Sequence, residues 1–377
     1  AEVILSVLVN FMLNFFKRFK HFDIPLLATT LLLSLAGIAI LYSTTLSENS
    51  NSLFYRQVLI LGVGMIISMF LSVLDYHTLA KANRIIYVVF ILLLLYLEIF
   101  GSVIRGGKRW LDLGFFSFQP AEFVKLVVIF GLARLLYLKR GQINSFKTLI
   151  WSFTYALVPA GLVILEPDLG SAIIILGLWL GIILLSPIKK KFLAIMFISF
   201  LAVAGLSWKF FLKDFQKDRI MVFIDPKLDP RGKGYNVRQA TIAVGSGQFT
   251  GRGLGKGVQS QHKFLPERQT DFIFAAGSEE IGFIGSFSLL GLYFFLFFRI
   301  LKVMKKAKDD PGMYIAGGVL FFFFFHVIIN IGMNIGLLPV TGIPLPFVSA
   351  GGSSLIVSLM ALGVVQNIAV QSKALRF

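Results

Sequence analysis

Residues 148 to 186 read TLIWSFTYALVPAGLVILEPDLGSAIIILGLWLGIILLS, a stretch in which two apolar runs follow each other almost without a break. Each run approaches the twenty or so residues that an α-helix needs to cross about 30 Å of hydrocarbon. Only Glu166, Pro167 and Asp168 separate the two runs. The stretch therefore predicts a tight hairpin of two membrane-spanning helices.

Apolar runs of similar length recur along the chain. We expect spans near 24–43, 57–74, 85–104, 120–138, 148–165, 169–186, 192–211, 272–298, 313–338 and 347–370. Charged residues make up only 15% of the chain, whereas soluble domains have about a quarter. The sequence predicts an all-α polytopic membrane protein with about ten transmembrane helices.

The basic residues predict how these helices are oriented. If the amino end is inside, the basic clusters at 17–20, 189–191 and 302–308 all fall on the inside. The short outer loops hold fewer basic residues, namely Arg56, Arg105, Lys108 and Arg109. The positive-inside rule then places both termini in the cytoplasm. The longest polar segment, 212–270, forms an extracytoplasmic loop between the seventh and eighth helices, and 237–244 suit a short amphipathic helix.

Composition excludes several function classes. The chain has no cysteine, which excludes disulfides, thiolate metal sites and cysteine nucleophiles. Its four histidines lie far apart in the sequence, so we expect no zinc site. The net charge of +17 would suit a nucleic-acid-binding protein. However, membrane topology accounts for the basic residues, and we expect no nucleic-acid partner.

Residues 1–21 form an apolar amino-terminal segment whose apolar part is too short to span a membrane comfortably. An interfacial helix and a signal-like segment are both open interpretations. Residues 22–377 are expected to form a single transmembrane domain.

Glu122 and Lys125 are ionisable residues within an expected span, which makes them candidates for function because such residues are costly in a membrane. They stand three apart and therefore share one helix face. They suit a mutual ion pair, and they also suit a polar cavity that opens to the outside. The two interpretations are compatible.

Asp271 lies where the long outer segment re-enters the membrane. Before an apolar run, Thr270 or Asp271 suits a helix cap. A carboxylate at the membrane surface beside Arg268 also suits a general base or a ligand for a hard cation. Glu279 and Glu280 follow two turns deeper, and we expect at least one of them to face the protein interior.

Arg105, Lys108 and Arg109 depart from the positive-inside trend. They are either solvated charges or an anion site, since guanidinium groups suit phosphate oxygens. Asn330 and Asn334 stand four apart in the ninth expected span. They either line a cavity or join helices through hydrogen bonds.

Several motifs occur together in a fixed order. They include GKRWLDLG at 107–114, FQPAEFVK at 118–125, EPDLG at 166–170 and LPVTGIPLPFVS at 338–349. In this order and spacing the chain resembles the SEDS family (shape, elongation, division and sporulation), and its RodA branch most closely. The resemblance covers about residues 22 to 370.

The resemblance implies a peptidoglycan glycosyltransferase that polymerises lipid II at the outer face of the bacterial cytoplasmic membrane, for cell elongation and shape. It also implies a class B penicillin-binding protein as transpeptidase partner, besides contact with membrane lipids. By correspondence Asp271 takes the place of the family's essential aspartate, and Glu122 and Lys125 match its polar pair, so we expect these three to be catalytic. Substrate binding is expected of Arg105, Lys108, Arg109, Glu267, Arg268, Glu279, Glu280 and Asn330.

The expected mechanism is inverting glycosyl transfer in which Asp271 accepts the proton of the attacking hydroxyl. Arg109, Lys125 and Arg268 are the candidates for stabilising the undecaprenyl diphosphate that leaves. A divalent cation, Mg²⁺ or Mn²⁺, and its ligation by Asp271 remain open. The alternatives are a lipid II flippase, for which the chain lacks a visible repeat, and a non-catalytic scaffold for a transpeptidase.

Overall fold

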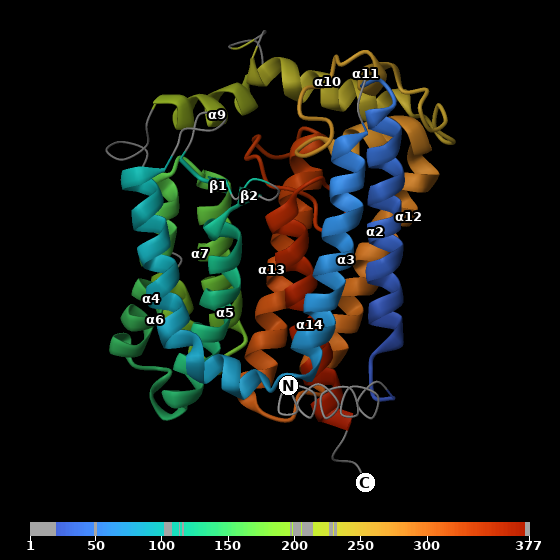
Figure 1. Ribbon diagram of the computed structural model, residues 1–377. Coiled ribbons are helices and arrows are strands. Elements are labelled where there is room, and N and C mark those ends of the chain that lie inside the picture. The colour runs from blue at the N-terminus through green and yellow to red at the C-terminus, as the bar shows by residue number, and fades with distance from the viewer. Residues whose placement is uncertain are drawn as a thin grey trace.

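A computed structural model describes residues 20–48, 51–101, 108–112, 114, 117–196, 198, 205, 214–225, 229 and 232–373. Its body is a bundle of long helices that run between two ends of the molecule (Figure 1). These are α2 (Ile24–Thr45), α3 (Ser52–Val73), α4 (Tyr76–Phe100), α5 (Pro120–Leu138), α6 (Phe146–Leu165), α7 (Leu169–Leu184), α12 (Ile273–Lys305), α13 (Asp310–Asn334) and α14 (Gly352–Lys373).

The expected polytopic helical fold is confirmed. Among the described residues, seven helices are long and apolar enough to cross a membrane. Two more, α5 with its charged residues and the 16-residue α7, lie within the same bundle. Helices occur at every expected span except 192–211, which lies mostly outside the described residues, as do residues 1–19 of the amino-terminal segment.

Burial separates inner from outer helices. The apolar stretch of α14 is 89% buried and that of α13 is 61% buried, whereas that of α4 is 17% buried. The outer helix turns large apolar side chains such as Ile85, Leu92 and Ile99 outward. This is the distribution expected when the surrounding solvent is lipid, because an aqueous solvent would drive these side chains inward.

The long loop covers one end of the bundle. It contains α9 (Asp214–Ile224), α10 (Lys233–Ser246) and α11 (Val258–Gln261), which lie across that end (Figure 1). Ala240 and Ala243 of α10 pack in one apolar cluster with Phe272 and Ala276, which anchors the loop to the start of α12. The amphipathic helix expected at 237–244 is thus part of a longer one.

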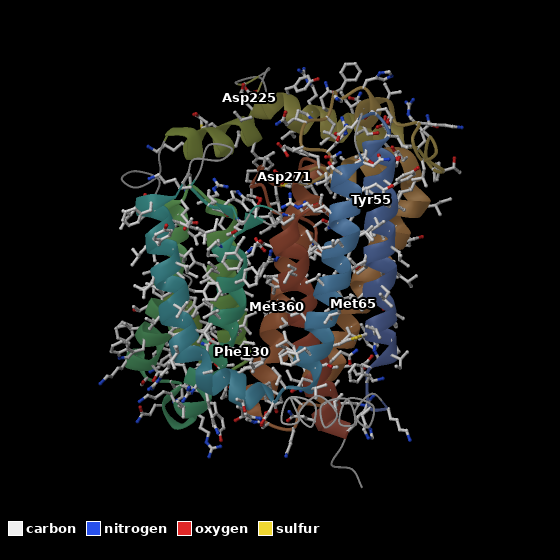
Figure 2. The ribbon with its side chains drawn as sticks, in the orientation of Figure 1. Tyr55, Met65, Phe130, Asp225, Asp271 and Met360 are labelled. Carbon is white, nitrogen blue, oxygen red and sulfur yellow. The ribbon has the colours of Figure 1, made fainter. Side chains whose placement is uncertain are left out.

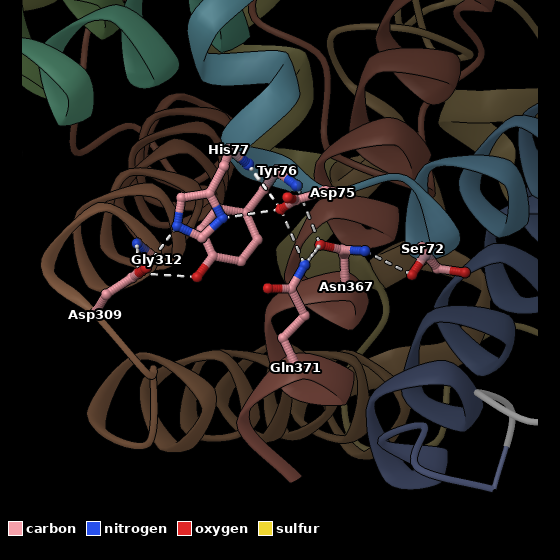
Figure 3. A network of polar contacts seen from close by, with 8 residues as sticks. All are labelled: Ser72, Asp75, Tyr76, His77, Asp309, Gly312, Asn367 and Gln371. Carbon is pink, nitrogen blue, oxygen red and sulfur yellow. Dashed lines mark hydrogen bonds and ion pairs between the residues drawn. The ribbon is translucent and has the colours of Figure 1, made fainter. Parts of the chain in front are cut away.

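Polar contacts join several elements at the opposite end (Figure 3). Lys373 at the end of α14 donates to the carbonyl of Phe22 over 3.2 Å, so both described ends of the chain lie here. His77 connects two loops, because its Nδ1 lies 2.9 Å from Asp75 Oδ1 and its Nε2 lies 2.6 Å from Asp309 Oδ2.

A short hairpin departs from the all-helical expectation. β1 (Leu111–Asp112) and β2 (Ser117–Phe118) pair antiparallel, with Leu111 opposite Phe118. Ser353 of α14 donates to the carbonyl of Ser117 over 3.0 Å, which ties the hairpin to the bundle. Strands of two residues are too short for an alternating apolar pattern to reveal them. A single 3₁₀ turn, η1 (Arg140–Gln142), follows α5.

α12 is interrupted at Gly282, where φ is 68°. The glycine-rich loop, residues 251–257, docks at this break, since the Arg252 amide donates to the Glu279 carbonyl over 3.0 Å. A Cβ on Gly251 would lie 2.1 Å from the Glu280 carbonyl oxygen, so only glycine permits this approach. The loop thereby satisfies backbone groups that the break would leave without partners.

Candidate active site

Asp271 lies at the end of the bundle that carries α9 to α11, as Figure 2 shows. It is half-buried and belongs to the turn that enters α12. The N-cap position of α12 is Phe272, and no side-chain cap hydrogen bond forms there. The N-cap position thus falls one residue after Asp271, and helix capping by Thr270 or Asp271 stays a prediction.

Two asparagines of α13 hold the backbone of Asp271. Its carbonyl oxygen accepts hydrogen bonds from Asn330 Nδ2 at 3.0 Å and from Asn334 Nδ2 at 2.9 Å. Both asparagines are fully buried. The Asn334 Oδ1 also accepts from the Ala275 amide at 2.9 Å, which fixes the first turn of α12. The two asparagines therefore act together to position the turn.

The two residues before Asp271 are held by the segment that precedes α14. The Gln269 carbonyl accepts from the Ala350 amide at 2.8 Å, and the Thr270 carbonyl accepts from Ser349 Oγ at 2.6 Å. Three consecutive carbonyl groups of this turn are thus fixed by other parts of the chain.

The proline-rich segment between α13 and α14 passes beside the Asp271 carboxylate. A Cβ on Gly342 would lie 3.5 Å from Asp271 Oδ2, and Gly342 has φ +77°. The same segment contacts the start of α7, because a Cβ on Gly170 would lie 3.0 Å from the Thr341 carbonyl oxygen. Irregular backbone at this depth is packed against protein, as the membrane requires.

Glu122 and Lys125 form the expected ion pair, with 2.6 Å between Lys125 Nζ and Glu122 Oε1. Sequence reasoning missed a third member, His326 of α13. Its Nδ1 donates to the Phe322 carbonyl at 2.7 Å, which leaves Nε2 to accept from Lys125 Nζ at 3.1 Å. All three charged or polar side chains are buried, and Glu122 Oε2 is buried without a hydrogen-bond partner among the described residues.

His326, Asn330 and Asn334 follow one another at four-residue intervals along α13. They therefore lie on one helix face. This face connects the buried Lys125 pair with the backbone of Asp271. The spacing was readable from the sequence, and extending the Asn330 and Asn334 pattern backward would have reached His326.

Arg268 anchors the turn to the end of α2. Its Nη2 donates to Glu48 Oε1 at 3.0 Å, to Ser47 Oγ at 3.0 Å and to the Thr44 carbonyl at 3.3 Å. The side chain is buried. Its charge thus has a carboxylate partner within the protein, one that sequence reasoning did not identify.

Glu267 lies in the same turn with φ +47°. Its Oε2 accepts from Thr270 Oγ1 at 3.0 Å, which helps to shape the turn.

Glu279 and Glu280 both face the protein interior, so the expectation for at least one of them is exceeded. Glu279 accepts from the amides of Gln259 at 3.0 Å and Ser260 at 3.1 Å. Glu280 accepts from Ser43 Oγ, and from Ser260 Oγ at 3.1 Å. These carboxylates join α11 and α2 to α12, and their substrate-binding role stays a prediction.

The basic residues of the hairpin region contact backbone carbonyl groups. Arg109 Nε donates to the Glu166 carbonyl at 2.7 Å, and another of its nitrogens donates to the Pro167 carbonyl. Lys108 Nζ donates to the Glu98 carbonyl at 2.9 Å. Arg105 lies outside the described residues. Arg109 thus fastens this segment to the α6–α7 turn and Lys108 fastens it to α4, while an anion site here stays a prediction.

The Glu166 side chain is fully buried at this turn, and neither carboxyl oxygen has a hydrogen-bond partner among the described residues. Burial, with the nearby Asp168 and Glu98 charges, raises the pKa of Glu166 to about 8, against the opposing charge of Arg109. Glu166 is therefore largely protonated near neutral pH.

The described residues contain no group of three or more His, Cys, Asp or Glu side chains arranged to hold a metal ion. Asp271 would consequently need ligands from outside this set to bind a cation.

The sequence model of the FtsW, RodA and SpoVE family, described as "Cell cycle protein", matches residues 21–374. The chain belongs to this family. The resemblance to SEDS proteins of the RodA type is confirmed.

Individual members of the FtsW, RodA and SpoVE family are similar over nearly their whole length. The chain is 35% identical to "Peptidoglycan glycosyltransferase MrdB" of Escherichia coli K12, covering 94% of this chain and 95% of that protein. It is 36% identical to "Stage V sporulation protein E" of Bacillus subtilis, with 93% and 98% covered.

Solved structures share the fold. The crystal structure of Thermus thermophilus rod shape determining protein RodA matches with a TM-score of 0.68 and 25% identity, covering 93% of this chain and 98% of that one. A chain from a structure on "coordination of polymerization and crosslinking by a peptidoglycan synthase complex" matches with a TM-score of 0.76 and 27% identity, with 93% and 98% covered.

Proposed function

We propose that this chain is a peptidoglycan glycosyltransferase, which polymerises lipid II into glycan strands at the outer face of the bacterial cytoplasmic membrane. The name of the Escherichia coli relative supports the activity. The single observation that carries the assignment is the turn at Asp271, whose carbonyl group is fixed by two buried asparagines while its side chain is half-buried.

The proposed reaction is a single displacement with inversion. The sugar 4-hydroxyl of the acceptor attacks the anomeric carbon of the donor, and Asp271 takes the hydroxyl proton as the new C–O bond forms. The bond from the anomeric carbon to undecaprenyl diphosphate breaks, and that group leaves with the electron pair. A positioned base contributes on the order of 10²–10⁴-fold, and holding both lipid-anchored substrates in line supplies much of the rest.

The charge of the leaving diphosphate needs compensation. Arg109, Lys125 and Arg268 were the candidates, and each has a partner within the protein. We therefore propose that Arg268 and Lys125 organise the site. Arg109, which precedes the β1–β2 hairpin, stays the candidate for contact with the diphosphate. A divalent cation would take ligands from the diphosphate oxygens besides Asp271.

The test uses purified protein in detergent with labelled lipid II and, where required, a transpeptidase partner. Glycan ladders on a gel are the expected result. Detergent micelles have no second compartment, so ladders also separate a polymerase from a flippase. Absence of ladders with the partner present, together with transport of lipid II in proteoliposomes, would reject the proposal.

A class B penicillin-binding protein is the proposed partner. A similar solved structure concerns a complex that coordinates polymerisation and crosslinking. Phe283, Phe287 and Phe294 expose 59%, 65% and 74% of their surfaces along α12, which suits contact with a membrane helix of a partner. Crosslinking mass spectrometry should find contacts on α12, α13 and residues 212–260. Crosslinks confined to the opposite end would contradict this.

Both termini are proposed to be cytoplasmic. The chain has no cysteine, so single cysteines report topology without background. Gln259→Cys should react with an impermeant maleimide on spheroplasts, and Lys190→Cys should react only after permeabilisation. Labelling of Lys190→Cys from outside would reverse the orientation and the location of the site.

A further inference from the structure

A cavity lies away from Asp271, at the end of the bundle where the described chain ends meet. It has a volume of about 450 Å³ and lies between α4, α5 and α6. Its lining includes Asn83, Arg84, Arg134, Lys139, Lys147 and Trp151. Nothing in the proposed glycosyl transfer uses this cavity.

The lining is strongly cationic. Arg84, Arg134, Lys139 and Lys147 all contribute, and no Asp or Glu lines the cavity. Within the part of the chain that the structure describes, the ion pairs involve other cations. Arg134 Nη1 contacts only backbone, donating to the Ala80 and Lys81 carbonyls at 3.1 and 2.7 Å. Clustered like charges around a hollow favour an anion inside it.

Buried Asn83 and the half-buried Tyr155 form part of the inner wall. Asn83 Nδ2 donates to the Tyr155 hydroxyl at 2.9 Å, and Tyr155 stacks on Tyr87 with 4.1 Å between ring centroids. A Cβ on Gly131 would lie 2.1 Å from the Tyr155 hydroxyl, so glycine here makes room for the ring. Three packed helices thus build the inner wall, whereas Arg84, Lys139 and Lys147 are exposed at the mouth of the cavity.

The outer rim of the cavity carries large apolar side chains beside its exposed basic ones. Trp151 is 61% exposed and Leu138 is 59% exposed, so both face the surrounding solvent. Tryptophan is enriched at the depth of lipid head groups. The head group of an anionic lipid that enters here would meet the basic side chains. Its apolar chains could lie against the exposed apolar side chains. A lipid fits this arrangement better than a fully water-soluble anion.

We propose that the cavity binds the phosphate head group of an anionic glycerophospholipid, with its acyl chains lying along α4 and α6. Basic pockets between membrane helices on the cytoplasmic side favour such head groups. The leaflet follows from the orientation proposed above and is the inner one. The bound lipid joins the cytoplasmic ends of α4, α5 and α6.

The test measures lipid preference directly. Wild-type protein is placed in nanodiscs of equal phosphatidylglycerol and phosphatidylcholine, and the lipids retained after release are counted by native mass spectrometry. Wild type should retain phosphatidylglycerol preferentially. Arg84→Gln with Lys147→Gln should lower the ratio of the two lipids on the order of tenfold, because each basic residue near the surface contributes to binding anionic lipid.

The matched control is Lys302→Gln with Lys305→Gln, which removes the same charge from exposed residues at the end of α12, away from the cavity. It should keep the wild-type ratio. Equal retention of both lipids by wild type, or an equal loss in both double variants, would overturn the proposal, since general charge attraction would then suffice.

A second measurement separates a lipid from a soluble anion. In detergent, added phosphatidylglycerol should raise the Tm of wild type and leave that of Arg84→Gln with Lys147→Gln unchanged. If millimolar inorganic phosphate raises the wild-type Tm as much, the lipid assignment is wrong. Neither measurement requires polymerisation, so failure here and failure of the proposed glycosyltransferase activity are distinguishable.

Discussion

Asp271 and the pair Glu279 and Glu280 lie near the start of α12, and neighbouring elements contact them through different groups. At Asp271 the neighbouring elements hold the main chain, through Asn330 and Asn334, while the side chain is half-buried. At Glu279 and Glu280 the neighbours hold the carboxylate oxygens themselves. A fixed backbone that presents a half-buried side chain suits a reacting group. Fully buried carboxylates that bond a neighbouring segment suit a structural role.

The comparison is tested most strongly by Asp271→Asn. The change removes the charge and the base but leaves the backbone contacts intact, because these use the Asp271 carbonyl group. Polymerisation should fall by a factor on the order of 10² or more. The Tm should stay close to that of wild type. The measurement pairs initial rates of ladder formation with thermal melts of the same samples.

Near wild-type rates from Asp271→Asn would remove Asp271 from catalysis. A large loss of Tm together with activity would instead make it a structural residue like the glutamates. Asp310→Asn is a matched control, since it makes the same change in an exposed residue at the start of α13, at the opposite end of the bundle.

Glu280→Ala should lower stability and largely spare activity, the reverse of the result expected for Asp271→Asn. It leaves Ser43, Ser260 and Gln261 without the carboxylate that they donate to. Buried donors without partners are costly, so we expect a loss of about 2 kcal/mol in the free energy of unfolding. Activity per folded molecule should remain within a few-fold of wild type. If the variant keeps wild-type stability but loses polymerisation, Glu280 takes part in the reaction and does not differ from Asp271 in role.

Much of this contrast was not readable from the sequence. Apolar runs and Pro120 are local signals, and they predicted the position of α5 with its Glu122–Lys125 pair. Pairings between distant residues carry no local signal. Lys125 meets His326 across 201 positions, and Arg268 meets Glu48 across 220. Such pairings depend on how helices pack, which composition and periodicity do not specify.

The same limit applies to the glycine-rich loop. The spacing of its glycines does not indicate which backbone the segment will approach. Gly251 contacts the backbone at the Gly282 break, and this contact depends on the conformations of two segments that are separate in the sequence. By contrast, the four-residue spacing of Asn330 and Asn334 did suggest a shared task, and the structure shows a joint contact with Asp271.

Asn330→Ala tests how far the backbone contacts matter for Asp271. The change removes hydrogen bonds to the carbonyl groups of Asp271 and Ile343. Loss of positioning should lower polymerisation about tenfold, with a smaller loss than Asp271→Asn because the base remains. The pH profile of the residual rate should keep its shape. A profile displaced to higher pH would show that Asn330 acts on the charge of Asp271 and does more than position it.

Glu166 offers a third case, in which a buried carboxyl group has neither bonded oxygens among the described residues nor an accessible side chain. Its pKa is raised from an ordinary 4.5 to about 8, chiefly by burial. Between these two values the unfolded chain has released a proton that the folded chain retains. Folding stability must therefore fall as pH rises through this window, and the dependence ends above the folded pKa.

Glu166→Gln should remove this pH dependence, because the amide has nearly the shape of the protonated acid and no charge to bury. Melts of wild type at pH 6 and pH 8 should differ by an amount on the order of 1 kcal/mol more than melts of the variant. Other groups titrate in both proteins, so the difference between them isolates Glu166. Asp168→Asn is the companion variant, since Asp168 caps α7 through the Ser171 amide at 3.0 Å and accepts from Gln119 at 3.3 Å. That variant should lose stability at both pH values and keep a smaller pH dependence than wild type, because the Asp168 charge no longer raises the pKa of Glu166. If the stability of Glu166→Gln depends on pH as steeply as that of wild type, the Glu166 carboxyl is ionised in the folded protein. It would then be held by a partner, as Glu279 and Glu280 are.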